Sequence, residues 1–144
     1  MQECDREENT MDRVEKALER HSRGYNCCQA VACSFADTLG YSEDEVFRMG
    51  EGFGAGMGGM QCTCGAVSGA VMAAGMKNSS GKDQPGSKGQ TYKLSGALAE
   101  KFREKNGSVI CCELKGLTGG QVLRSCNGCI EDAVRLAEEV LDLK

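Results

Sequence analysis

The stretch MGEGFGAGMGGMQCTCGAVSGAVMAAGMK, residues 49–77, joins a glycine-rich segment, a Cys-Thr-Cys motif and a long apolar run. The apolar run from Cys64 to Met76 covers 13 residues, fewer than the roughly 20 that a membrane-spanning helix needs. It therefore predicts a buried helix rather than a membrane span. Small residues along this helix, among them Gly65, Gly69 and Ala73, allow neighbouring helices to pack closely around it. We therefore expect it near the centre of the fold.

The remainder of the chain also has helical periodicity. Apolar residues recur at spacings of three and four over residues 11–21, 92–102 and 126–141. Asn26 is a favourable N-cap, and Ser42 followed by Glu45 forms a capping box. The sequence predicts an all-α fold: a compact bundle of five or six helices around the glycine-rich, cysteine-initiated helix, in a single domain over residues 1–144.

Composition excludes several classes of protein. The chain has 17 basic and 21 acidic residues and a net charge of -4, which gives no electrostatic footprint for nucleic acid. The N-terminal residues MQECDREENTMDRVEK are polar and acidic, without the basic and apolar regions of an export signal. We expect a cytoplasmic protein that has no membrane span and does not bind nucleic acid.

Cysteine is the unusual component, with 10 residues against one histidine. In a chain without an export signal, this number indicates metal or redox chemistry more than a structural disulfide framework. Adjacent cysteines on a helix point in different directions, so only one of each vicinal pair is expected to reach a shared site. Cys4 and Cys33 are assigned no role. The other eight form close pairs: Cys27 and Cys28, Cys62 and Cys64, Cys111 and Cys112, Cys126 and Cys129.

Two of these thiols lie at predicted helix starts, Cys64 and Cys126. The partial positive charge and free amides of a helix N-terminus favour thiolate over thiol, so both are candidates for a reactive or ligating sulfur. His21, the only histidine, falls on the apolar stripe of the first helix. We expect it to be a core or boundary residue, able to deprotonate a thiol if the fold brings one near.

At these residues the chain resembles the family of redox-active proteins named for the cysteine pattern C_GCAxxG_C_C. The resemblance places the four characteristic cysteines at Cys27, Cys64, Cys111 and Cys126, and leaves Cys28, Cys62, Cys112 and Cys129 as auxiliary thiols. It implies a small bacterial or archaeal protein with a redox role or a bound iron–sulfur group, and an oxidoreductase or transporter as partner. The segments that carry it are GYNCCQAV (24–31), GFGAGMGGMQCTCGAVSGAVMAAG (52–75), NGSVICCELKG (106–116) and CNGCIEDAVRLAEEVL (126–141).

Three functions remain open. In the first, Cys64 or Cys126 attacks a disulfide or passes electrons, and a neighbouring thiol resolves the intermediate. In the second, the four characteristic cysteines bind Zn²⁺ or an iron–sulfur cluster, since four thiolates suit either. A variant of this second function binds Cu(I) through soft sulfurs, with Met57, Met60, Cys62 and Cys64 as ligands. The third is a structural helical protein whose buried thiols are inert.

Overall fold

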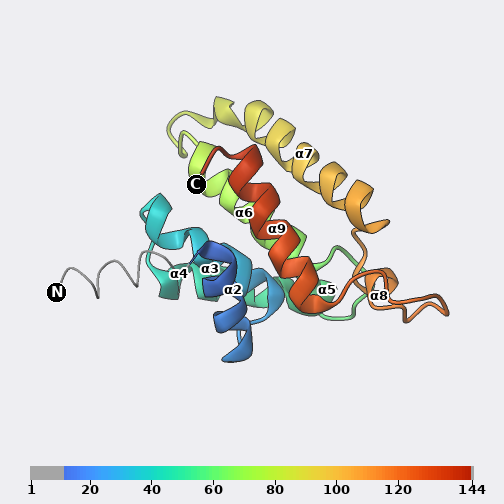
Figure 1. Ribbon diagram of the computed structural model, residues 1–144. Coiled ribbons are helices and arrows are strands. Elements are labelled where there is room, and N and C mark those ends of the chain that lie inside the picture. Colours follow the sequence, from blue (N-terminus) through green and yellow to red (C-terminus); the bar gives the residue numbers. More distant parts are fainter. Residues whose placement is uncertain (1–11, 144) are drawn as a thin grey trace.

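The computed structural model describes residues 12–143, and every regular element in that range is a helix (Figure 1). The all-α prediction is therefore confirmed for the described residues. The predicted number of helices, five or six, is not confirmed, because short helical segments connect the longer ones. The longer helices are α2 (Arg13–Ser22), α3 (Cys27–Leu39), α4 (Glu43–Gly50), α6 (Gly65–Asn78), α7 (Lys88–Asn106) and α9 (Cys126–Val140), and the short ones are η1 (Glu51–Phe53), α5 (Gly54–Met57), η2 (Pro85–Ser87) and α8 (Cys111–Leu114).

Local capping signals set the helix boundaries, as the sequence predicts. Asn26 caps α3 and forms a reciprocal capping box with Gln29. Ser42 and Glu45 do the same for α4, and Gly107 ends α7 in a left-handed conformation with φ of 86°. Within residues 12–143, no helix has the length and apolar character needed to cross a membrane. Cys4 lies outside the described residues.

Helix α6 packs against α3, α7 and α9 (Figure 1). Its packing against α3 depends on glycine: a Cβ added at Gly69 would lie 2.7 Å from the carbonyl oxygen of Cys28 and 2.9 Å from Cβ of Val31. A Cβ added at Gly65 would lie 3.3 Å from Cβ of Cys27. The two glycines therefore allow the first turn of α3 to lie beside the first turn of α6.

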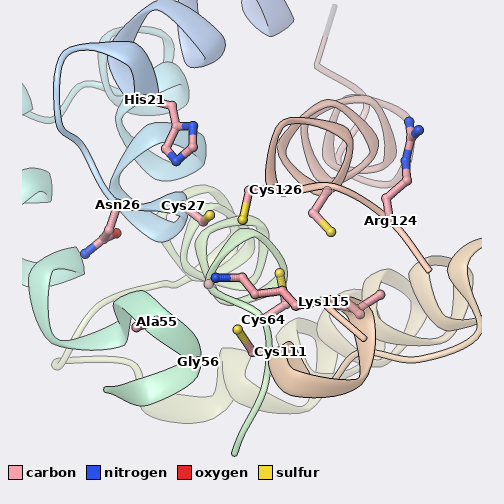
Figure 2. Close-up of a pocket in the computed structure, with 13 residues that line it drawn as sticks. His21, Asn26, Cys27, Ala55, Gly56, Cys64, Cys111, Lys115, Arg124 and Cys126 are labelled. Carbon is pink, nitrogen blue, oxygen red and sulfur yellow. The ribbon is translucent and has the colours of Figure 1, made fainter. Parts of the chain in front are cut away.

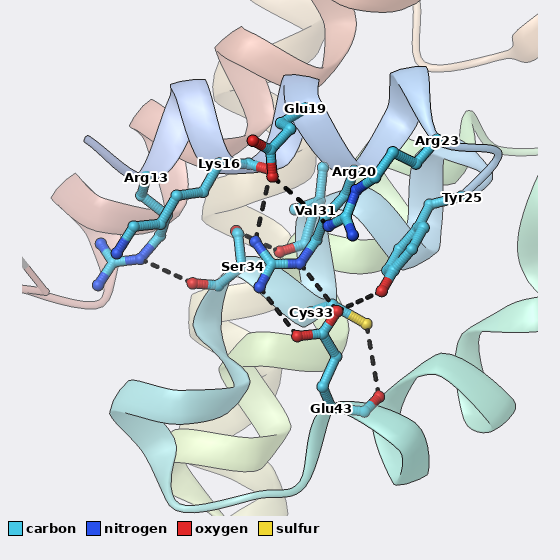
Figure 3. A network of polar contacts seen from close by, with 10 residues as sticks. All are labelled: Arg13, Lys16, Glu19, Arg20, Arg23, Tyr25, Val31, Cys33, Ser34 and Glu43. Atoms are coloured by element: carbon cyan, nitrogen blue, oxygen red, sulfur yellow. Dashed lines mark hydrogen bonds and ion pairs between the residues drawn. The ribbon is translucent and has the colours of Figure 1, made fainter. Parts of the chain in front are cut away.

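A polar network joins α2, α3 and α4 (Figure 3). The Arg20 guanidinium donates from Nε to Oε2 of Glu43 at 3.0 Å and from an Nη to Oε1 at 2.9 Å, and the hydroxyl of Tyr25 also donates to this carboxylate. These hydrogen bonds, that from Arg20 first, lower the pKa of Glu43 to about 2. The thiol of Cys33 donates to the backbone carbonyl of Glu43 at 3.7 Å. Cys33 therefore belongs to this structural network.

Candidate functional site: a cavity lined by cysteines

Five cysteines line a cavity of about 190 Å³ (Figure 2). Cys27 opens α3, Cys64 is the N-cap residue of α6, Cys111 opens α8, and Cys126 and Cys129 lie in the first turn of α9. The structure thus places in one cavity the four cysteines to which the family resemblance points. Cys129, named from the sequence only as an auxiliary thiol, lies among them.

Backbone hydrogen bonds fix the start of α6 beside the start of α8. The amide of Cys64 donates to the carbonyl of Val109 at 2.7 Å, and the amide of Cys111 donates to the carbonyl of Cys62 at 2.9 Å. The glycine-rich segment closes over this junction. Gly56 has a φ of 53°, and a Cβ at this position would overlap Cβ of Cys111. Glycine is therefore required where this segment forms the wall of the cavity.

The second cysteine of each vicinal pair lies away from the cavity. Cys27 and Cys111 are lining residues, whereas Cys28 and Cys112 are not. Cys28 is fully buried, and its thiol donates to Sδ of Met72 at 3.4 Å. The prediction that one thiol of each vicinal pair reaches a shared site is confirmed.

The proposed Cu(I) ligands do not gather in this cavity. Cys64 lines it, but Met57, Met60 and Cys62 do not. Met57 is 54% exposed, and Cys62 is also exposed.

Cys64 differs from its neighbours in acidity. Its pKa is lowered to about 7 by a hydrogen bond from the Cys129 thiol and, after that, by the backbone amides of Ala66 and Val67 in the first turn of α6. The Lys115 ammonium lowers it further. Burial opposes these effects, because Cys64 is only 5% exposed, but it does not outweigh them. The helix-start thiolate expected from the sequence is therefore favoured at Cys64.

The pKa values of three other lining thiols move in the opposite direction. Burial and the nearby Cys126 and Cys64 raise the pKa of Cys27 to about 12. Burial raises the pKa of Cys111, and the hydrogen bond to Cys64, followed by burial, raises that of Cys129. A position at a helix start is therefore not enough to lower the pKa of a thiol, since Cys27 also opens a helix and its pKa is raised.

Lys115 is a site residue that the sequence analysis missed. Its side chain extends among the thiols of the cavity (Figure 2). Partial burial lowers its pKa, but electrostatic interactions with the nearby sulfurs of Cys126 and Cys111 outweigh burial and raise it. The available signal is its position four residues after Cys111, at the C-cap of the short helix α8.

Asn127 and Gly128, the two residues inside the CxxC motif, each lie against a neighbouring side chain. Oδ1 of Asn127 lies 3.0 Å from Nδ1 of His21, which lines the cavity. A Cβ at Gly128 would lie 2.5 Å from Nε of Arg124, and Arg124 in turn donates to the buried carboxylate of Asp132 at 3.0 Å. His21 is therefore a boundary residue, as expected, and it lies close to the thiols.

The Zn²⁺ and iron–sulfur alternatives require thiolates that converge on one point. Among residues 12–143, no group of three or more His, Cys, Asp or Glu side chains is arranged so that it could hold a metal ion. The four characteristic cysteines line the same cavity without forming such a group.

In a comparison with protein families, one family model matches most of the chain. A family model described as "Putative redox-active protein (C_GCAxxG_C_C)" matches residues 25–140. The matched range includes all five cysteines of the cavity. Comparisons with curated proteins and with solved structures found no match.

Proposed function

The chain belongs to the C_GCAxxG_C_C family, and on this premise we propose that it is a thiol–disulfide redox protein in which Cys64 attacks and Cys129 resolves. The observation that carries the proposal is that Cys64, the N-cap residue of α6, and Cys129, in the first turn of α9, line the same cavity. Cys64 has a pKa lowered to about 7, and the Cys129 thiol that hydrogen-bonds to it is held protonated. Thiolate is the nucleophile in disulfide exchange, so the pair supplies an attacking sulfur and a second thiol beside it.

The reaction proceeds in two exchanges. The Cys64 thiolate attacks one sulfur of an external disulfide, forms a mixed disulfide and releases a thiolate. This neutralises Cys64 and so removes the main cause that raises the pKa of Cys129. Cys129 then transfers its proton to the released thiolate and attacks Cys64, which releases the second thiolate and leaves a Cys64–Cys129 disulfide. The external disulfide gains two electrons, and the two cysteines lose them.

Two of the other three lining thiols offer a second pair. Cys27 and Cys126 lie in the same cavity as Cys64 and Cys129, and the nearby Cys126 is one of the causes that raise the pKa of Cys27. This arrangement supports passage of the disulfide from the first pair to the second by further exchange. A redox partner, such as the oxidoreductase that the resemblance implies, would return the protein to the dithiol form.

Disulfide mapping tests this proposal. Protein reduced and treated with a chelator under anaerobic conditions is equilibrated with increasing ratios of oxidised to reduced dithiothreitol, quenched with acid and alkylated, and its disulfides are located by mass spectrometry. We expect the first disulfide to join Cys64 to Cys129. Oxidation confined to Cys62 or Cys112, with Cys64 still a thiol, would contradict the assignment.

Metal analysis of the same protein before chelation addresses the alternative function. A stoichiometric metal whose removal exposes Cys27, Cys64, Cys111 and Cys126 to alkylation would favour a metal site over disulfide exchange. We expect alkylation of Cys64 to be the same with and without the chelator.

A further inference from the structure

Two cationic side chains that line the cavity differ in their partners. Arg124 forms ion pairs with Asp132 at 3.0 Å and Glu131 at 3.8 Å. Lys115 forms no ion pair with a carboxylate in the part of the chain that the structure describes. Lys115 is therefore a cation of the cavity that an incoming group can neutralise.

The surroundings of Lys115 favour a negative charge. No Asp or Glu side chain is among the described residues that line the cavity, where Lys115 lies beside Cys126 and Cys111 (Figure 2). The N-terminal turns of α3, α6 and α9 also meet at the cavity, and helix N-termini carry partial positive charge. A partly buried ammonium is stabilised by a paired anion. An anionic group beside Lys115 would therefore be stabilised both by the ammonium and by the helix N-termini.

The size of the cavity and the burial of the nucleophile restrict the substrate further. A volume of about 190 Å³ corresponds to roughly six water molecules at their share of liquid volume. The sulfur acceptor must reach Cys64, which is 5% exposed. A disulfide held flat on the surface of a folded protein does not meet this requirement, whereas the end of a small molecule does.

We propose that the substrate of this site is a small disulfide that carries an anionic group, and that this group pairs with Lys115 while Cys64 attacks the disulfide. The inference rests on the proposed function and uses the same exchange. One substrate S–S bond breaks, a bond forms to Cys64, and the two thiolates released in turn take the electrons that Cys64 and Cys129 lose. The ammonium of Lys115 keeps its proton throughout and acts by charge.

Three disulfides of similar size and different charge test this inference. They are 3,3′-dithiodipropionate, an anion; 2-hydroxyethyl disulfide, which is neutral; and cystamine, a cation. The rate of Cys64 modification is measured by mass spectrometry for each at one pH and low ionic strength, and each rate is divided by the rate of the same disulfide with free 2-mercaptoethanol, because the leaving thiols differ in pKa. We expect this normalised rate to be about tenfold higher for the anion than for the cation, because charge pairing at a partly desolvated site favours the anion. The ratio of the two rates cancels any effect of Lys115 on the pKa of Cys64, since both react with the same thiolate.

Variants assign the preference to Lys115. In Lys115→Gln we expect the ratio of the anion rate to the cation rate to fall several-fold, whereas Lys115→Arg should retain it. Lys93→Gln is the matched control, because it removes the same charge from an exposed position on α7 outside the cavity, and it should leave the ratio unchanged. Circular dichroism checks that each variant folds, and the order of rates in the unmodified protein tests the charge preference without any variant.

The outcomes separate the two proposals. Modification of Cys64 at equal rates by all three disulfides, or fastest by cystamine, would overturn the anionic substrate and leave thiol–disulfide exchange supported. An unchanged ratio in folded Lys115→Gln would overturn the role of Lys115. Failure of Cys64 to react with any of the three would overturn the proposed function, and the inference with it.

Discussion

Cys64 and Cys129 line one cavity, and a hydrogen bond from the Cys129 thiol to the sulfur of Cys64 moves the pKa values of the two thiols in opposite directions. The negative charge is favoured on Cys64, where the backbone amides of Ala66 and Val67 also stabilise it. The proton is retained by Cys129, whose pKa is raised by the hydrogen bond to Cys64 and by burial. The pair therefore has a defined direction, with Cys64 as the attacking sulfur.

Removal of the donor at position 129 should make Cys64 less reactive. In Cys129→Ala we expect the pKa of Cys64 to rise from about 7 toward its ordinary 9.0, because the largest stabilising cause is lost. Alkylation of Cys64 near neutral pH should then slow by about tenfold. Cys129→Ser is the matched variant, since its hydroxyl can still donate, and it should slow less. Equal rates in Cys129→Ala and the unmodified protein would show that another group activates Cys64.

Close packing of α3 on α6 should depend on Gly69. A Cβ there would lie 2.7 Å from the carbonyl oxygen of Cys28, so we expect Gly69→Ala to lower the free energy of unfolding by about 1–3 kcal/mol. Gly75 lies in the same helix with no heavy atom within 4 Å of an added Cβ, and Gly75→Ala should raise stability by about 0.5–1 kcal/mol. Urea denaturation of the reduced proteins measures both. Similar effects from the two substitutions would contradict the packing described for α3 and α6.

The carboxylate of Glu43 should make a pH-dependent contribution to stability. Its folded pKa, about 2, lies below its ordinary 4.5, so the contribution is fully present above pH 4.5 and is lost as the pH falls toward 2. The side chain is 40% exposed, and solvent screening limits the expected loss in Glu43→Gln to about 1 kcal/mol at neutral pH. Thermal unfolding from pH 7 to 2.5 should show the two proteins converging. A difference that stays constant over this range would contradict the assignment.

Features that depend on neighbouring residues could be predicted from the sequence. Capping residues such as Asn26 and Ser42 act within one turn of their own helix, and the helix-start positions of Cys64 and Cys126 follow from the same kind of local signal. Vicinal spacing on a helix also predicted that only one thiol of the pair Cys27 and Cys28 reaches a shared site. The family pattern supplied the expectation that four distant cysteines share a site.

Features that depend on contacts between distant segments could not be predicted. The hydrogen bond between Cys64 and Cys129 requires α6 and α9 to pack at one particular register, and no local pattern specifies this. Gly56 belongs to a segment that the sequence shows only as glycine-rich, and its lack of a side chain is required by Cys111, far away in the chain. Lys115 enters the site through the turn at α8, an element too short to give a periodic signal.

The pH dependence of Cys64 alkylation tests the central claim most directly. Protein reduced and freed of metal is exposed briefly to iodoacetamide across a pH series, and modification of each cysteine is quantified by mass spectrometry. We expect the rate at Cys64 to rise tenfold per pH unit below pH 7 and to level off above a midpoint near 7, the pKa set by Cys129 and the amides of α6. At pH 7, about half of Cys64 would then be thiolate, against about 1% for a thiol of pKa 9. A midpoint near 9, or no modification of Cys64 at any pH, would contradict an activated nucleophile at this position.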